Sequence, residues 1–272
     1  MIFQTRAKVI KNVEVAKKYY KILLSCPRVS RIAQPGQFIE VKISDNYEPL
    51  LRRPFSIHRI RGRDIEVLYE VVGTGTEILS RKESGENLDI LGPLGCGFDL
   101  AASNYNRTSI LVAGGIGIAP LFFLAEKIAE IKNPSPVGRQ EKSKIKNIVL
   151  IGGRTKNDIL CEREFKEAGC AVKISTDDGS RGFKGKVTDL LKHLLSTINY
   201  RLSTIYACGP RPMLKTISQI ARDYKIPCQV SLEEHMACGI GACLGCMVKT
   251  KHGYQRVCKE GPVFNAHEII WE

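Results

Sequence analysis

Residues 237–246 read ACGIGACLGC, and a further cysteine follows at position 258. The four cysteines of this region have the spacing C-x4-C-x2-C-x11-C and are Cys238, Cys243, Cys246 and Cys258. Plant-type [2Fe–2S] clusters are held by four cysteine thiolates at this kind of spacing. Gly239, Gly241 and Gly245 allow the loop to curl around two irons and to turn its N–H groups toward sulfur. The pattern therefore predicts an iron–sulfur cluster and a role in electron transfer.

Zinc is the alternative ligand for the same cysteines, and unligated structural thiols are a third interpretation. Zinc modules usually present two short Cys pairs, or Cys with His, at knuckle spacing. This sequence has one C-x2-C pair and a glycine-rich loop. The cysteine spacing therefore favours an iron–sulfur cluster over zinc.

The chain has 272 residues, a length typical of two or three domains. Its composition, with 43% hydrophobic and 25% charged residues, is that of an ordinary soluble globular protein. The N-terminus has no apolar region typical of a signal peptide. The longest uncharged apolar stretch, Ile110 to Ala125, is short for a membrane span and contains glycines and a proline. We therefore expect no membrane association. Without a secretory signal, the ten cysteines favour reduced thiols in the cytoplasm.

The net charge of +13 raises the question of nucleic-acid binding. The excess of Lys and Arg is spread along the chain, no basic run is interleaved with aromatic residues, and there is one Trp. A basic stacking groove therefore has no local support. The charge favours anionic small molecules or an acidic partner surface, and a solvated surface explains it equally well.

Hydrophobic periodicity divides the chain into three parts. Alternating runs such as 37–43 and 65–71 predict an antiparallel β-barrel in the first hundred residues. From about Asn104 strands alternate with helices, which predicts a mostly parallel sheet. Its strands are expected at 109–113, 148–151, 171–174 and 204–207, its first helix at 120–132, and an exposed connection at 133–146. The predicted domains are 1–103 (a β-barrel), 104–228 (an α/β domain) and 229–272 (the [2Fe–2S] module).

Three segments of the barrel region together predict a flavin dinucleotide site. Arg53-Pro54-Phe55-Ser56 is followed by Leu68-Tyr69-Glu70 and then by a turn that contains Gly75 and Thr76. Arg53 can neutralise a diphosphate, and the Ser56 hydroxyl can hydrogen-bond a polar ring edge. Gly75 and Thr76 precede a helical stretch expected over 77–81, so their N–H groups face an anion there. Each segment alone is weak, but the ordered set predicts FAD.

Residues 113–120, AGGIGIAP, lie between the first strand and first helix of the α/β region. Glycines such as Gly115 and Gly117 at this place let a dinucleotide approach the backbone. Pro120 breaks the full G-x-G-x-x-G pattern, and the absence of Lys-Ser/Thr disfavours nucleotide hydrolysis. The carboxylates of Asp177 and Asp178 favour NAD over NADP, although a surface Asx turn explains them as well.

Cys208 follows the last strand of the predicted parallel sheet, where ligands bind in open α/β folds. Its thiol can contact the nicotinamide, and a buried inert cysteine is an equal alternative. The other five cysteines have no neighbour at ligand spacing and are interpreted as structural: Cys26, Cys96, Cys161, Cys170 and Cys228.

In this order, the segments resemble the ferredoxin–NADP reductase superfamily. Residues 231–246 (SLEEHMACGIGACLGC) and 257–264 (VCKEGPVF) closely resemble the electron-transfer subunits of class 1B, NAD-dependent dihydroorotate dehydrogenase. The resemblance implies transfer of electrons from the FMN of a separate catalytic subunit, through [2Fe–2S] and FAD, to NAD+ in pyrimidine biosynthesis. It implies that the four cysteines ligate the cluster, that the three barrel segments bind FAD, and that two copies of each subunit form a heterotetramer.

Two alternatives remain open. The small subunit of NADH-dependent ferredoxin:NADP oxidoreductase, or sulfide dehydrogenase, has the same three parts but typically Asp at the first ligand position. Cys238 stands there in this chain and favours the dihydroorotate system. A non-enzymatic alternative is a zinc-stabilised, nucleotide-sensing binding protein. Under the leading hypothesis no side chain of this chain is catalytic, because dihydroorotate chemistry resides in the partner and this chain positions and tunes its cofactors.

Overall fold

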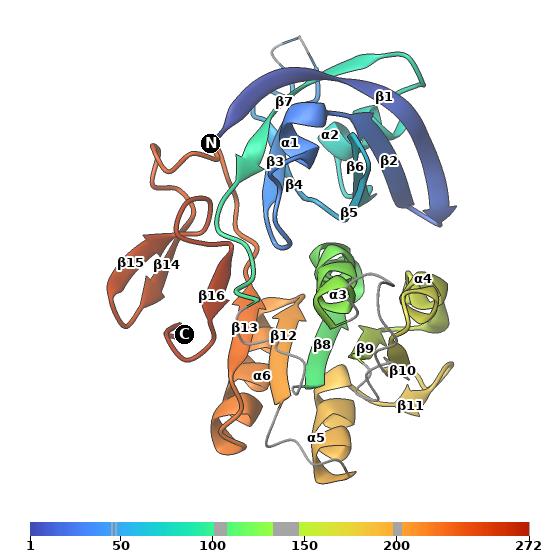
Figure 1. Cartoon of the computed structure of the whole chain (residues 1–272), viewed down its shortest axis with the longest axis vertical. Helices are drawn as coiled ribbons and strands as arrows, with labels where there is room; N and C mark the ends of the chain where they lie inside the picture. The colour runs from blue at the N-terminus through green and yellow to red at the C-terminus, as the bar shows by residue number, and fades with distance from the viewer. Residues whose placement is uncertain (45, 47, 101–107, 133–146, 198–202, 272) are drawn as a thin grey trace, which may run out of the picture. The chain divides into compact units, whose positions relative to one another are not determined.

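The computed structural model describes residues 1–44, 46, 48–100, 108–132, 147–197 and 203–271. The chain forms two compact units (Figure 1). The first contains Met1–Gly97 and Leu232–Val263, and the second contains Phe98–Ser231 and Phe264–Glu272. The predicted connection over 133–146 and the predicted boundary after residue 103 lie outside the described residues.

The first unit is built on a curled, seven-stranded antiparallel sheet in the order β4-β3-β7-β1-β2-β6-β5. Alternating side chains such as Ile22 and Leu24 of β2 pack inside the curl, as the period-2 pattern predicts. Its strands are β1 (Phe3–Ala16), β2 (Tyr19–Ser25), β3 (Phe38–Lys42), β4 (Arg53–Ser56), β5 (Arg59–Arg61), β6 (Asp64–Glu70) and β7 (Asn87–Leu94). Two short helices, α1 (Pro27–Ser30) and α2 (Thr74–Ser80), lie between strands. The predicted antiparallel barrel is confirmed.

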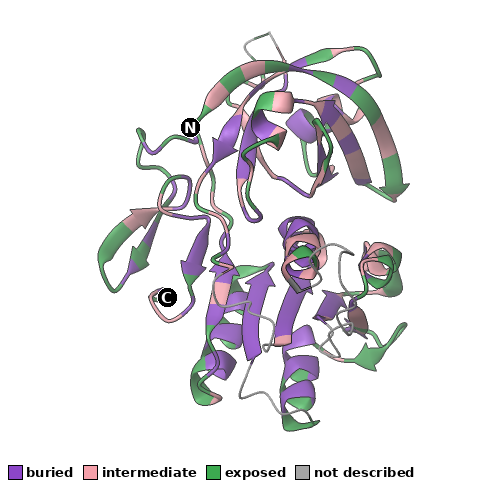
Figure 2. Cartoon of the chain, in the orientation of Figure 1, coloured by how far each residue is buried: buried purple, intermediate pink, exposed green. Residues whose placement is uncertain are grey.

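The second unit is built on a sheet in the order β11-β10-β9-β8-β12-β13-β16, and its described pairings are parallel. Ile110 to Ala113 of β8 are fully buried (Figure 2), as expected for a central strand covered on both faces. The strands are β8 (Thr108–Gly114), β9 (Ile148–Gly153), β10 (Ala171–Thr176), β11 (Phe183–Lys184), β12 (Ser203–Cys208), β13 (Cys228–Ser231) and β16 (Val263–Asn265). The predicted parallel sheet is confirmed.

Helices follow the strands of the second sheet in the βα order that the sequence predicts. α5 packs on β8, β9 and β10, and α3 packs on β8 and β12. The helices are η1 (Gly115–Ile118), α3 (Ala119–Lys132), η2 (Lys156–Asp158), α4 (Glu162–Glu167), α5 (Val187–Thr197) and α6 (Arg211–Asp223). No helix among the described residues is long and apolar enough to span a membrane.

The cysteine-rich segment is a loop followed by an antiparallel hairpin of β14 (Met247–Thr250) and β15 (Gly253–Arg256). Leu232–Val263 belongs to the first unit, and β16 extends the sheet of the second unit. The backbone N–H of Leu232 donates to the Pro262 carbonyl at 2.9 Å, which joins the two ends of the segment. The segment therefore carries its four cysteines on a closed loop anchored at both ends.

Candidate functional site

The cysteines predicted to hold a cluster lie on two neighbouring stretches of the first unit. Cys238, Cys243 and Cys246 lie on the loop before β14, and Cys258 lies just after β15. The Val257 N–H donates to the Cys246 carbonyl at 2.9 Å, and the Cys258 N–H donates to Cys246 Sγ at 3.4 Å. The hairpin therefore brings the distant fourth cysteine back to the loop, as the ligand spacing requires.

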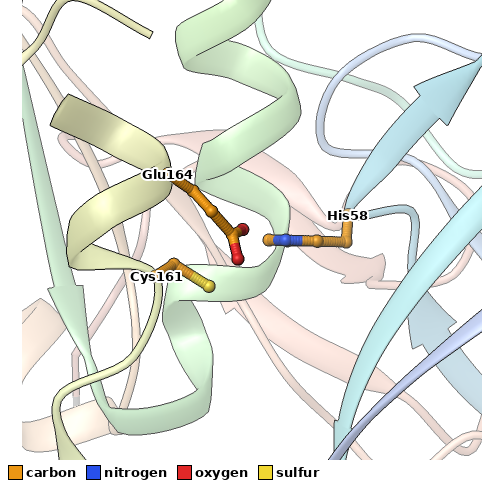
Figure 3. Close-up of side chains that lie close together, drawn as sticks. All are labelled: His58, Cys161 and Glu164. Carbon is orange, nitrogen blue, oxygen red and sulfur yellow. The ribbon is translucent and has the colours of Figure 1, made fainter. Parts of the chain in front are cut away.

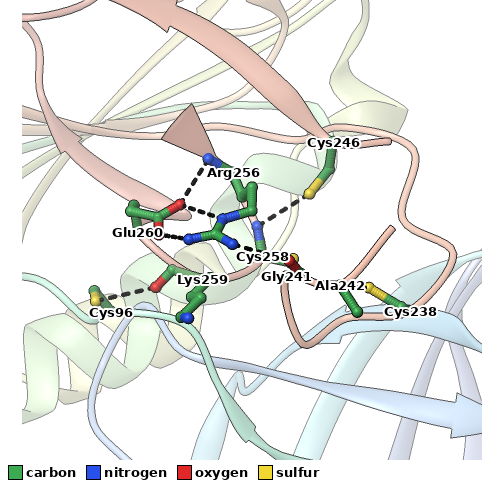
Figure 4. Close-up of polar contacts among 9 residues, drawn as sticks. All are labelled: Cys96, Cys238, Gly241, Ala242, Cys246, Arg256, Cys258, Lys259 and Glu260. Atoms are coloured by element: carbon green, nitrogen blue, oxygen red, sulfur yellow. Dashed lines mark hydrogen bonds and ion pairs between the residues drawn. The ribbon is translucent and has the colours of Figure 1, made fainter. Parts of the chain in front are cut away.

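Backbone N–H groups point at sulfur within this loop (Figure 4). Ala242, drawn in that figure, donates to Cys238 Sγ at 3.3 Å. Cys243 donates to the same sulfur at 3.4 Å. Burial raises the pKa of Cys238, but hydrogen bonds from Cys243 and other loop N–H groups outweigh it and lower the pKa to about 6. Gly239 and Gly241 have φ of +67° and +81°, and this left-handed backbone turns the N–H groups inward. A thiolate-stabilising loop of this kind fits a [2Fe–2S] cluster.

The flavin segments of the sequence meet in the first unit. A Cβ added to Gly75 would lie 3.0 Å from Arg53 Nε, so the Arg53 side chain of β4 lies against the start of α2. Arg53 Nη1 also donates to the Leu51 carbonyl at 2.7 Å. A guanidinium beside a helix start can neutralise a diphosphate that also contacts the backbone N–H groups. The arrangement fits the phosphate end of FAD.

The helix that contains this glycine begins earlier than predicted, at Thr74 in place of Glu77. The Thr76 hydroxyl accepts the N–H groups of Val72 and Gly73 at 2.9 and 3.2 Å and donates to the Gly73 carbonyl at 3.0 Å. These bonds supply partners at the helix start. They use the Thr76 hydroxyl inside the turn, so the backbone and Arg53 remain as the predicted phosphate contacts.

Tyr69 is a core residue of β6 that carries a buried hydroxyl. Its OH donates to Asn12 Oδ1 at 3.0 Å, and its ring meets that of Phe55 edge-on at 5.7 Å. Asn12 Nδ2 donates in turn to the carbonyls at the end of α2. Tyr69 therefore links the flavin strand β4 to helix α2. Its neighbours Leu68 and Glu70, with Pro54 and Ser56 of β4, stay predicted flavin contacts.

Glu40 of β3 is a buried carboxylate that the sequence analysis missed. Neither of its oxygens has a hydrogen-bond partner among the described residues. Burial raises its pKa to about 7, against the nearby Arg52 charge. A Cβ on Gly239 would lie 2.6 Å from Glu40 Cγ, so the cluster loop packs on this side chain. Glu40 pairs in register with Pro54, so the loop lies one strand from the flavin motif.

The predicted dinucleotide turn of the second unit packs tightly against the end of β12. A Cβ on Gly117 would lie 2.4 Å from the Cys208 carbonyl oxygen and 2.6 Å from the Gly209 nitrogen. Gly115 has φ of +54° and open space where a side chain would project. The structure therefore brings Gly117 and Cys208 together as predicted and leaves Gly115 facing outward. Met213 of α6, which no motif indicated, lies against Gly114 and Gly209.

The acidic turn after β10 has the geometry of an Asx turn. The Ser180 N–H donates to Asp178 Oδ1 at 2.9 Å, and hydrogen bonding to Ser180 lowers the pKa of Asp178. This turn geometry is the alternative that the sequence left open. The preference for NAD over NADP stays a prediction.

Outside the cluster loop, the cysteines have varied surroundings, and none of the ten is in a disulfide. Cys161 precedes α4 with φ of +58°, and Glu164 lies in the first turn of that helix (Figure 3). His58, also labelled there, follows β4 in the first unit, where its Nε2 lies 3.9 Å from Glu66 Oε1. Cys26, Cys170 and Cys228 are buried and Cys96 is exposed.

Comparison with known proteins gives two matching family models. One, described as the iron–sulfur cluster binding domain of dihydroorotate dehydrogenase B, matches residues 233–270. The other, described as an oxidoreductase NAD-binding domain, matches residues 111–219. A solved structure of the NADH-dependent reduced ferredoxin-NADP oxidoreductase, studied for flavin-based electron bifurcation, is similar with a TM-score of 0.82 and 29% identity, over 97% of this chain and 90% of that one. Fold and site together define an NAD-linked oxidoreductase subunit with a flavin barrel and an iron–sulfur module.

Two relatives named dihydroorotate dehydrogenase B (NAD(+)), electron transfer subunit, are similar over nearly their full length. The protein from Desulforamulus reducens is 41% identical over 98% of both chains. The protein from Geobacillus sp. is 40% identical over 99% of this chain and all of its own. The chain belongs to the family of dihydroorotate dehydrogenase B electron transfer subunits.

Proposed function

We propose that the chain is the electron-transfer subunit that passes electrons from the FMN of a dihydroorotate dehydrogenase catalytic subunit, through [2Fe–2S] and FAD, to NAD+ in pyrimidine biosynthesis. Bound FAD supplies the conversion between single electrons and hydride. The four cysteines hold the cluster, Arg53 and Gly75 hold the FAD diphosphate, and Gly115, Gly117 and Cys208 hold NAD. We further propose three modules at 1–103, 104–228 and 229–272, a heterotetramer of two of each subunit, and a cytoplasmic location.

The observation that carries this proposal is the packing of the cluster loop on β3. Gly239 lies against Glu40, and Glu40 is opposite Pro54 of the flavin strand β4. One strand therefore separates the first cluster ligand from the predicted flavin residues, and all of them belong to one compact unit. This arrangement supports electron transfer between cluster and FAD.

Exposed apolar side chains around the cluster support the docking of a partner. Ile240 and Leu244 on the loop are 47% and 53% exposed, and Met247 and Tyr254 on the β14–β15 hairpin are 40% and 65% exposed. Several exposed apolar side chains within one short segment are typical of protein interfaces. We propose that the FMN-containing catalytic subunit covers them, which places the cluster where electrons arrive.

The redox assignment is tested on the purified, cofactor-replete chain. We expect about two irons and acid-labile sulfide per chain, a flavin absorption, and bleaching of both by NADH. A single zinc with no bleaching would favour the nucleotide-sensing protein. Cys246→Ser should abolish the cluster signal and leave FAD bound, because the flavin residues lie on other strands. Loss of both from this variant would contradict the modular assignment.

The partner is tested by co-purification from the native cell. We expect an FMN-containing subunit and NADH formation that depends on dihydroorotate. Ile240→Asp and Leu244→Asp should weaken this association, whereas Val15→Asp, at a 47% exposed position of β1, should not. NADPH formation that depends on reduced ferredoxin, without activity on dihydroorotate, would favour the ferredoxin:NADP oxidoreductase alternative.

A further inference from the structure

Arg256, two residues before the ligand Cys258, holds the carboxylate of Glu260 in a fork. Its Nε donates to Glu260 Oε2 at 2.9 Å, and Nη2 donates to Oε1 of the same carboxylate (Figure 4). The backbone N–H of Arg256 also donates to Oε2, at 2.8 Å. A planar guanidinium that makes two hydrogen bonds to one carboxylate has a fixed orientation. Glu260 therefore orients Arg256.

The remaining nitrogen of this fork reaches the cluster loop. Arg256 Nη1 donates to the Gly241 carbonyl at 2.9 Å, across 15 residues of sequence. Gly241 lies between the ligands Cys238 and Cys243. A Cβ there would lie 2.8 Å from Lys259 Cδ, so the loop also packs on the stem of Lys259. Arg256 thus joins the loop that carries three ligands to the turn that carries the fourth.

The peptide that Arg256 holds also faces a ligand sulfur. The Gly241 backbone lies close enough to the Cys258 thiol to act on its ionisation, and it favours the thiolate against the effect of burial, which raises the pKa of Cys258. N–H groups directed at cluster sulfurs raise the reduction potential, because they stabilise the more negative reduced state. A shift of the Gly241 peptide would weaken its interaction with Cys258 and loosen the spacing between the two segments that Arg256 joins.

We propose that Arg256, oriented by Glu260, is a positioning residue that fixes the Gly241 peptide and thereby sets the stability and the reduction potential of the cluster. The proposal rests on the proposed function, because it requires a cluster on the four cysteines. A half-buried Arg–Glu pair near the surface contributes little by itself. The pair acts through a further hydrogen bond of Arg256, to the carbonyl of Gly241, which lies between the proposed ligands Cys238 and Cys243.

The test uses the full-length, cofactor-replete chain and three variants. Arg256→Lys keeps the charge but cannot grip Glu260 and Gly241 from one planar group. Glu260→Gln keeps the shape of the side chain but removes its charge, which weakens the hydrogen bonds that orient Arg256. Arg163→Lys is the matched control, because Arg163 pairs with Glu167 at the same i, i+4 spacing, at 2.7 Å, on helix α4 of the second unit. Each is measured by EPR-monitored redox titration, by iron release to a ferrous chelator, and by FAD content.

We expect Arg256→Lys to move the cluster to a more negative potential and to speed iron release about tenfold or more, within the range for supporting contacts of metal ligands. Glu260→Gln should change both in the same direction by less, and Arg163→Lys should match the wild type. FAD content should stay unchanged throughout. Unchanged potential and iron release in Arg256→Lys, or equal loss of FAD and iron, would overturn the proposal. A wild-type chain without iron would instead refute the proposed function.

Discussion

The tight approach of Gly117 to the end of β12 gives a quantitative prediction for Gly117→Ala. The new Cβ would lie 2.4 and 2.5 Å from the carbonyl oxygen and carbon of Cys208. Ordinary contact requires about 1 Å more, and the atoms to be displaced belong to the backbone of a buried strand. Overpacking of this kind costs about 3 kcal/mol.

Gly115→Ala is the matched control, two residues away on the same turn. Its Cβ would meet nothing within 4 Å, but φ at this position is +54°. The left-handed backbone therefore costs Ala about 1 kcal/mol without moving any neighbour. The two variants separate steric displacement of β12 from local backbone strain.

Calorimetry of the cofactor-bound protein and stopped-flow reduction of FAD by NADH measure the two effects. We expect the transition of the second unit to fall by about 10 °C in Gly117→Ala and by about 3 °C in Gly115→Ala. A displacement of about 1 Å beside the predicted nicotinamide site should slow FAD reduction by roughly 100-fold in Gly117→Ala. Equal losses in both variants, or a Gly117→Ala protein with wild-type stability, would refute the steric argument.

Three further predictions concern other parts of the molecule. Asn12→Ala should destabilise the first unit by about 2 kcal/mol and lower its FAD content, since Asn12 bonds the carbonyls that end α2 and the Tyr69 hydroxyl; a melting curve like that of the wild type would contradict this. Arg53→Ala should weaken FAD binding about 10- to 100-fold in a fluorescence titration, whereas Arg81→Ala, which removes only an exposed pair with Glu77, should not. Burial raises the pKa of the Cys228 thiol to about 12, so at pH 8 a maleimide should label the exposed Cys96 and leave Cys228 unmodified in the native protein, as peptide mass spectrometry would show.

The sequence predicted those strands and helices that are determined by a short stretch of neighbouring residues. The apolar run 109–113 lies within β8, and the helix expected from residue 120 begins one residue earlier as α3. The spacing of the cysteines predicted the ligand loop for the same reason. The helix after Gly73 was placed three residues late, because its start depends on the Thr76 hydroxyl bonding back to the turn.

Long-range pairings were not predictable in this way. β16 is three residues long and joins the sheet beside β13, more than thirty residues earlier in sequence. No local period distinguishes such a strand from a loop, because its partner supplies the hydrogen bonds. The hydrogen bond from Arg256 to the Gly241 carbonyl could not be predicted for the same reason, because the two residues meet only in the folded chain.

Glu40 shows how tertiary packing changes the meaning of a local pattern. The alternation over 37–43 places Glu40 and Lys42 on the polar face of β3, which for an isolated sheet is the face toward water. The structure covers that face at Glu40 with the cluster loop, so the carboxylate is fully buried while Lys42 is only partly so. A buried carboxylate with no hydrogen-bond partner among the described residues is costly, and the packing of the cluster loop accounts for its burial. The cluster loop therefore covers the polar face of the strand that lies beside the predicted flavin strand.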